Sequence, residues 1–392
     1  MNKQMNRQIF LLYVTVFISI LGFGMVFPLF PLFAESFSAT ALDIGLMAAT
    51  FSLAQFLTAP LLGRMSDRFG RKPIIVFSIV SSAVSYVIAA FAPNLSVLYL
   101  SRIIHGMASA GVFPIASAYI ADITSKEDRA KYMGKIAGVF SFGFMFGPVI
   151  GGLLGSYGFA AAFLAAAVVS VFNLIFILAM LPESVTKKAE KLVLREGLFN
   201  FKEVYHGLRG DFGVLFFILF AWAFYISNFQ VAIPLYMQNV FSTGTVGIGI
   251  FFSITGTTAT IAQWFLLPMV VKRIGELKTI LAGIGLMILG QFFATIWASQ
   301  ALFYLFFIIS IMGSGLKRPT VNAVLSKATH TGQGATMGLA FSFESLGRVI
   351  GPLIAGFAIA RFGLQFPFWA TVVVLIVGFL LFYKVEMKRI RK

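Results

Sequence analysis

The sequence predicts an all-α membrane protein made of two pseudo-symmetric bundles of six helices. Of its 392 residues, 59% are hydrophobic and only 11% are charged, and the mean hydropathy is +0.93. No soluble domain needs that much apolar surface. The charges gather in short segments between long apolar runs, and the two halves of the chain resemble each other. These three observations carry the prediction of the fold class.

Apolar runs of about 20 residues are long enough to cross a bilayer as helices. Runs of that kind, separated by turn signals and charged segments, predict helices over 8–33, 43–63, 73–92, 97–121, 134–154, 159–181, 213–237, 246–270, 279–297, 301–326, 335–358 and 366–385. The longest polar stretch lies in the middle of the chain and is rich in Lys and Glu. We therefore expect an N-terminal bundle over 1–182, a cytoplasmic linker over 183–211 and a C-terminal bundle over 212–392.

The halves repeat at a spacing of about 204 residues. Pro114 returns as Pro319, and the segment 146–152, which reads FGPVIGG, returns as 350–356, IGPLIAG. Two halves of six helices in a parallel repeat are typical of a transporter that rocks around a central site.

Basic residues are distributed asymmetrically between the loops. They concentrate in alternate loops and in the C-terminal tail, whereas the loops of the other parity carry no Lys or Arg apart from Arg361. By the positive-inside rule, both termini should be cytoplasmic in a multi-pass protein of the cell (inner or plasma) membrane. The net charge of +16 then reflects topology, and no nucleic acid is expected as a partner.

The composition also limits the possible chemistry. Cysteine is absent and the three His are scattered, so we expect no metal site and no cofactor, with a proton as the coupling ion. No nucleophile and base are placed as in an enzyme, so no catalytic residues are predicted. The apolar run 9–33 is too long for a signal peptide. A monomer is expected, with the lipid bilayer and a small-molecule substrate as its partners.

Between the second and third predicted helices the chain reads GRMSDRFGRK over 63–72. This segment resembles the loop signature of the major facilitator superfamily. The resemblance implies that the loop controls conformational change: its Asp approaches the start of helix eleven, and a loop Arg reaches an acid at the end of helix four, here Asp122. The residues that match are Gly63, Asp67, Arg68, Gly70, Arg71 and Lys72. A segment made only positive by topology would explain the basic residues but not the Asp or the glycines.

Helix four carries Arg102 and His105 in a stretch that resembles the family's Arg-x-x-x-Gly element. A charge that faces lipid costs about 2.5 to 3.5 kcal/mol or more, so Arg102 should face a cavity or a partner. We name it as a candidate for proton coupling, with structural anchoring as the alternative. His105 is a candidate for the substrate cavity or, alternatively, a hydrogen-bonded interior residue.

Helix five matches the Gly-Pro-x-x-Gly-Gly element of the proton-coupled drug antiporter branch of this family. The matching positions are Gly143, Gly147, Pro148, Gly151 and Gly152. Small residues at this spacing allow helices to approach closely. Together with the other two motifs, the resemblance favours an exporter over an importer.

Glu344 is the acidic residue nearest to mid-membrane, and Arg348 lies four residues further on the same helical face. Burial disfavours the charged carboxylate and the guanidinium favours it, so this Glu could load and release a proton. The alternative is a static ion pair that locks the helix.

The sequence departs from well-known drug exporters in the acids of helices one, seven and ten. Helix seven has neutral polar and aromatic residues, and helix ten has two cations that either face a cavity or snorkel to the surface. The candidates for the substrate cavity here are Trp222, Tyr225, Asn228, Gln230, Lys317 and Arg318. A neutral and cationic cavity suits uncharged, zwitterionic or anionic cargo.

Three functions stay open at this point. The first is proton-coupled efflux of drugs or other small amphiphiles by alternating access. The second is transport of a sugar, metabolite or organic anion on the same fold. The third, an intramembrane enzyme or receptor, lacks both a catalytic constellation and a soluble domain.

Overall fold

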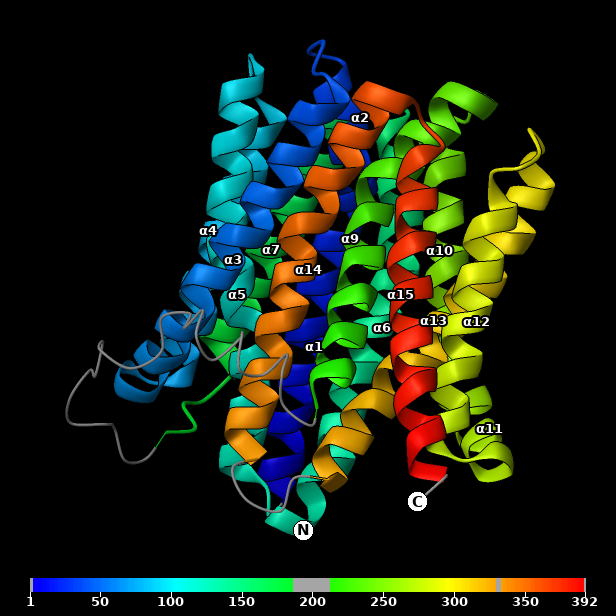
Figure 1. Ribbon diagram of the computed structural model, residues 1–392. Coiled ribbons are helices and arrows are strands. Elements are labelled where there is room, and N and C mark those ends of the chain that lie inside the picture. The colour runs from blue at the N-terminus through cyan, green and yellow to red at the C-terminus, as the bar shows by residue number, and fades with distance from the viewer. Residues whose placement is uncertain (1–2, 186–211, 329–332, 391–392) are drawn as a thin grey trace. The chain divides into compact units, whose positions relative to one another are not determined.

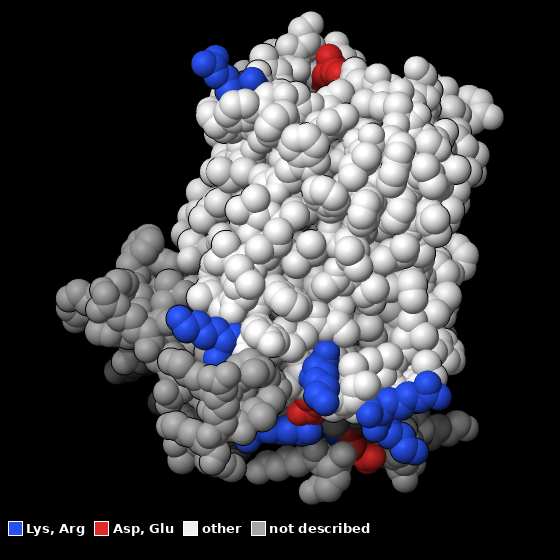
Figure 2. Space-filling model, turned by 45° about the vertical axis from the view of Figure 1, so that its right-hand side comes forward, with Lys and Arg blue, Asp and Glu red and all other residues white. Residues whose placement is uncertain are grey.

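The structure is a computed structural model that describes residues 3–185, 212–328 and 333–390. Over these ranges, twelve helical segments are long and apolar enough to cross a membrane, as the sequence predicts. On the face in Figure 2, Lys and Arg side chains gather near the ends of the helices, and a broad surface between them carries no charged residue. The linker predicted over 183–211 lies almost entirely outside the described residues.

The first half contributes helices that follow one another through very short connections (Figure 1). They are α1 (Lys3–Val26), the 3-10 turn Phe27–Leu29, α2 (Phe30–Glu35), α3 (Ala41–Phe69), α4 (Arg71–Ala90), α5 (Leu95–Ile123), α6 (Lys126–Gly155) and α7 (Phe159–Met180). Pro28 and Pro31 lie where α1 gives way to the turn and α2, because proline removes a helical hydrogen bond and crowds the preceding turn.

The second half repeats this pattern. Its helices are α9 (Gly213–Phe241), α10 (Thr245–Ile261), the π-helical turn Ala262–Leu266, α11 (Leu267–Ile274), α12 (Glu276–Ala294), α13 (Gln300–Ala328), α14 (Gln333–Phe362) and α15 (Phe366–Ile390). The π turn precedes Pro268, and such turns accommodate a local irregularity of the hydrogen-bond ladder. α10, the turn and α11 together make one membrane span.

The helices group into two compact units. The first contains α1, α2, α3 from Thr50 onward, α4 to α7 and the segment Gly244–Ser253. The second contains Ala39–Ala49, α9, α10 from Ile254 onward and α11 to α15. The first turns of α3 and of α10 thus belong to the unit formed mainly by the other half, a feature that the division at residues 182 and 212 does not include.

Glycines let helices approach closely at the same place in each unit. In the first unit, a Cβ added at Gly24 would lie 3.2 Å from the Cα of Gly147, and a side chain at Gly151 would overlap the backbone of Met25. In the second, the Ser227 hydroxyl donates to the Gly347 carbonyl at 3.0 Å. Thus α6 packs on α1 as α14 packs on α9, and the packing expected of helix five is present.

Candidate functional site

The junction between α3 and α4 is a single residue, Gly70, rather than the longer loop that the sequence predicts. α3 continues to Phe69 and α4 begins at Arg71, so most of the segment 63–72 is helical. Gly70 has φ of +112° and ψ of 158°, a conformation that is essentially restricted to glycine. The hydropathy pattern misplaced this boundary because α3 extends beyond its apolar portion.

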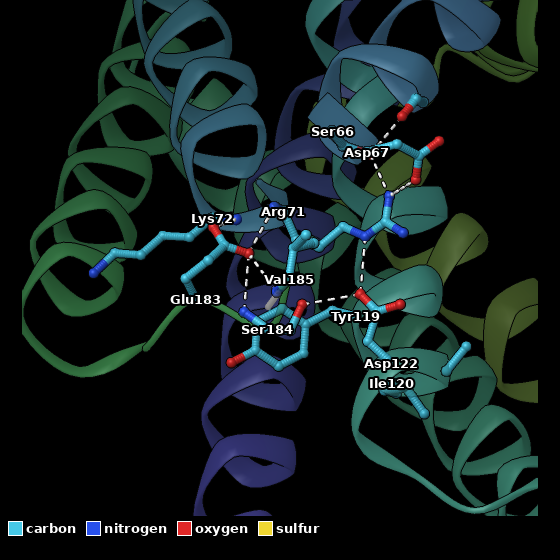
Figure 3. Close-up of polar contacts among 12 residues, drawn as sticks. Ser66, Asp67, Arg71, Lys72, Tyr119, Ile120, Asp122, Glu183, Ser184 and Val185 are labelled. Atoms are coloured by element: carbon cyan, nitrogen blue, oxygen red, sulfur yellow. Dashed lines mark hydrogen bonds and ion pairs between the residues drawn. The ribbon is translucent and has the colours of Figure 1, made fainter. Parts of the chain in front are cut away.

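Arg71 is the centre of a polar cluster at this junction (Figure 3). Its Nη1 donates to the Asp67 carboxylate at 2.5 Å and to the Ser66 hydroxyl at 2.6 Å. Its Nε donates to the Asp122 carboxylate, at the end of α5, at 3.0 Å. The predicted contact between the loop and Asp122 is therefore present, and Arg71 makes it.

Glu183 completes the cluster and was not identified from the sequence, which placed it in the linker. Its carboxylate accepts the backbone N–H groups of Arg71 at 2.8 Å and of Lys72 at 3.1 Å. It thereby satisfies two of the free donors that begin α4, where a negative charge is also favoured by the helix dipole. A side chain at Gly70 would overlap this carboxylate. The free N–H groups of α4 were a signal that some acceptor must lie here.

Other members of the motif have simpler surroundings. Lys72 Nζ donates to the Leu178 carbonyl at 3.1 Å, and Arg68 lies over the Phe69 ring at 5.4 Å. A Cβ added at Gly63 would meet nothing within 4 Å. The approach of Asp67 to helix eleven and the gating role of the motif stay predictions.

Arg102 and His105 lie on α5 and are both buried, at 4% and 2% exposure. The Arg102 guanidinium lies between two aromatic rings, 4.2 Å from the centroid of Phe30 and 4.0 Å from that of Phe51. The His105 Nε2 and the Tyr86 hydroxyl are 3.0 Å apart. This contact agrees with the interpretation of His105 as a hydrogen-bonded interior residue.

Glu344 on α14 is 4% exposed and is held by two arginines. Arg348 Nη2 donates to its carboxylate at 2.9 Å, as the spacing of four residues predicts. Arg318 on α13 adds two more bonds, from Nε and Nη2, both at 2.9 Å. The sequence did not indicate this second partner, because the contact joins two helices and residues 26 positions apart.

The candidates for the substrate cavity in the second unit surround this ion pair. The Arg318 guanidinium lies over the Trp222 ring at 4.3 Å, and Trp222 Nε1 donates to the Ser314 hydroxyl at 2.9 Å. Lys317 is fully buried, with its Nζ donating to the Ile218 carbonyl at 3.2 Å. The alternative that Lys317 snorkels to the surface is therefore wrong, because its ammonium finds a carbonyl inside the unit.

The remaining candidates, all on α9, are less polar in their contacts. The Tyr225 hydroxyl accepts a hydrogen bond from Ser310 at 3.0 Å. Asn228 is buried and its Nδ2 has no hydrogen-bond partner among the described residues, whereas Gln230 is half-buried. Away from the helix ends, the described spans thus contain four cations and one carboxylate: Arg102, Lys317, Arg318, Arg348 and Glu344.

Twelve spans in two repeated units, with a buried ion-pair network rather than a catalytic constellation, define a secondary membrane transporter. The chain belongs to the Major Facilitator Superfamily, whose model matches residues 12–335 and 265–392. The family resemblance of the three motifs is thereby confirmed.

Curated relatives match over nearly the whole chain. Multidrug resistance protein 2 of Bacillus subtilis is 28% identical over 96% of both chains. The class C tetracycline resistance protein of Escherichia coli is 32% identical over 89% of both. The quinolone resistance protein NorA of Staphylococcus aureus is 28% identical over 90% of both.

Solved structures share the fold. A bacterial homologue of the human lysosomal transporter Spinster, in an inward-facing and occupied conformation, has a TM-score of 0.80 at 14% identity, covering 99% of this chain and 98% of that one. The human organic anion transporter MFSD10 has a TM-score of 0.70 at 23% identity, covering 97% and 100%.

Proposed function

We propose that the chain exports drugs or other small amphiphilic molecules across the cell membrane by alternating access, driven by protons. The observation that carries the direction and cargo is the set of relatives named for multidrug, tetracycline and quinolone resistance, matched over about nine-tenths of the chain or more. The positive-inside distribution supports cytoplasmic termini, so cargo would leave from the side that carries the 63–72 segment.

Proton coupling rests on Glu344. Its carboxylate joins α14 to α13 through Arg318 and joins two turns of α14 through Arg348. Protonation would remove the charge that holds both arginines, and because Arg348 is tied to the same helix, the link to α13 would weaken first. A proton and the Arg318 contact would therefore compete for one carboxylate, which is the kind of exchange that couples a proton to a movement.

The alternative function is export or import of a sugar, metabolite or organic anion. The excess of cations over carboxylates in the membrane interior favours an anionic or zwitterionic cargo within this alternative. Uptake of a labelled sugar or metabolite with no effect on drug resistance would support it.

Expression in a drug-sensitive bacterium tests the proposal. We expect the chain to raise the minimum inhibitory concentrations of several antibiotics or dyes at least fourfold over the empty vector. Asp67→Asn should abolish most of that protection at an equal membrane level, because it weakens the contact with Arg71 that accompanies the gating segment. Asp128→Asn is the matched control, since the Asp128 carboxylate makes no ion pair with any described residue. No protection by the unmodified chain would contradict drug efflux.

A further inference from the structure

We propose that Arg102 is a binding site for the carboxylate of an aromatic organic anion or zwitterion, a substrate class within the proposed function on which this inference rests. The site lies in the first unit alone, on α5 and the helices that pack on it, and is separate from the Glu344 network.

The Arg102 guanidinium is buried but its hydrogen-bonding capacity is not used. The Phe30 and Phe51 rings lie 4.2 and 4.0 Å from it and stabilise its charge through cation–π contacts. Its Nε and Nη1 donors have no hydrogen-bond partner among the described residues. In that part of the chain, no carboxylate lies within ion-pair distance of it. The aromatic rings therefore hold the cation while its N–H groups still need an acceptor.

A neighbouring residue has the same property. His105 follows Arg102 by three positions, on the same face of α5, and shares the Phe51 ring, whose centroid is 5.4 Å from that of the imidazole. Its Nε2 is engaged with Tyr86, whereas its Nδ1 is buried without a partner. Two adjacent side chains, each more than nine-tenths buried, thus present unused polar atoms.

The other interior guanidiniums differ from Arg102. Arg318 and Arg348 both donate to Glu344, so their charge is already compensated by the protein. Leaving buried polar groups unpaired is costly, and a native protein retains such groups where a ligand completes them. An anionic oxygen is the acceptor that compensates both the charge and the free N–H groups of Arg102.

The surroundings indicate the rest of the ligand. Phe23 contacts His105 and Phe51 at centroid distances of 5.7 and 6.1 Å, and Phe144 contacts Phe23 at 6.3 Å. Flat aromatic molecules pack well against such rings, and apolar surroundings strengthen a charge-assisted hydrogen bond. A planar ring system that carries a carboxylate combines both requirements.

Equilibrium binding to the purified full-length chain in nanodiscs at pH 7.5 tests this site. The probe is nalidixic acid, an aromatic carboxylic acid without a basic amine, and its neutral methyl ester is the reference. We expect the acid to bind about 10- to 100-fold more tightly than the ester, the size of a charged hydrogen bond converted to affinity. Arg102→Gln should abolish this preference, and Arg102→Lys should retain part of it because it keeps the charge but not the planar guanidinium.

Arg361→Gln is the control, because Arg361 is exposed in the last turn of α14 and should keep the full preference. Equal binding of acid and ester by the unmodified chain would overturn the inference without the use of any variant. An unchanged preference in Arg102→Gln would overturn it as well. Because binding needs no gradient, a chain that prefers the acid but confers no resistance would contradict the proposed efflux and leave this site supported.

Discussion

At the scale of single residues, two glycines of one motif lie in opposite environments. Gly70 has a positive φ and faces the Glu183 carboxylate, whereas Gly63 lies within α3 with open space around it. A side chain at Gly70 would be strained both by its backbone conformation and by its neighbour, and a side chain at Gly63 would meet neither obstacle. The same letter in one sequence motif therefore has two physical reasons.

We expect Gly70→Ala to lower the free energy of unfolding by about 1 to 3 kcal/mol, the usual cost of a strained backbone conformation. Gly63→Ala should leave it unchanged or raise it by up to about 1 kcal/mol, because Ala is the better helix former. The measurement is the thermal midpoint of both purified variants in the same detergent. Equal midpoints for the two variants would show that the conformation of Gly70 carries no strain for other residues.

Residue types and spacing predicted the contacts of Arg71 with Asp122 and of Arg348 with Glu344. The first came through a family resemblance, and the second came from the helical repeat, which places residues four apart on one face. Glu183 and the bond from Arg318 to Glu344 could not be predicted in this way. Each joins segments far apart in the chain, and pairing across helices depends on their packing, which no local pattern encodes.

At the scale of the elements, the glycines of α6 determine how closely it packs on α1. Gly151 faces the Met25 backbone and Gly147 faces Gly24, whereas Gly134 on the same helix has no neighbour within 4 Å of an added Cβ. A methyl group at Gly151 must therefore push α1 and α6 apart, and one at Gly134 need not move anything.

Gly151→Ala should destabilise the protein by about 1 to 3 kcal/mol, the usual range for overpacking, and should reduce transport. Gly134→Ala serves as the control and should resemble the unmodified protein. Thermal unfolding followed by size-exclusion chromatography measures both. A Gly151→Ala variant as stable and active as the control would refute the close contact between α1 and α6.

Hydropathy predicted all twelve spans but not where their helices end. α3 runs to Phe69 and α6 starts at Lys126, several residues beyond the predicted limits. An apolar run marks the part of a helix that suits lipid, whereas the hydrogen-bond ladder continues into polar sequence until a cap or a glycine ends it. Gly70 ends α3 in this manner, and Ser125 begins α6 by accepting the Asp128 N–H.

At the scale of the whole molecule, the repeat explains the shared backbone but not the chemistry. Gly347 and Gly351 on α14 are packed on α9 as Gly147 and Gly151 on α6 are packed on α1. The charged groups do not follow this symmetry, since Glu344 has no acidic counterpart near position 140 in the sequence. Each half has kept the packing of a common design and acquired its own polar residues.

The charge distribution predicts topology for the molecule as a whole. A green fluorescent protein fused after Lys392 should fluoresce, and alkaline phosphatase fused there should be inactive, because both report a cytoplasmic C-terminus. Alkaline phosphatase fused after Gly158, in a loop without Lys or Arg, should be active. The reverse pattern at either fusion site would contradict cytoplasmic termini.

The central claim is that a proton taken up by Glu344 drives drug movement. It is tested most directly in proteoliposomes by measuring gradient-driven transport of a fluorescent dye by the unmodified chain and by Glu344→Gln. Glu276→Gln is the matched control, because Glu276 also forms an ion pair, with Lys327 at 2.6 Å, but at the helix ends. We expect rapid transport by the unmodified chain and by Glu276→Gln, and at least a tenfold loss in Glu344→Gln with dye exchange at zero gradient retained. Undiminished gradient-driven transport by Glu344→Gln would contradict the account.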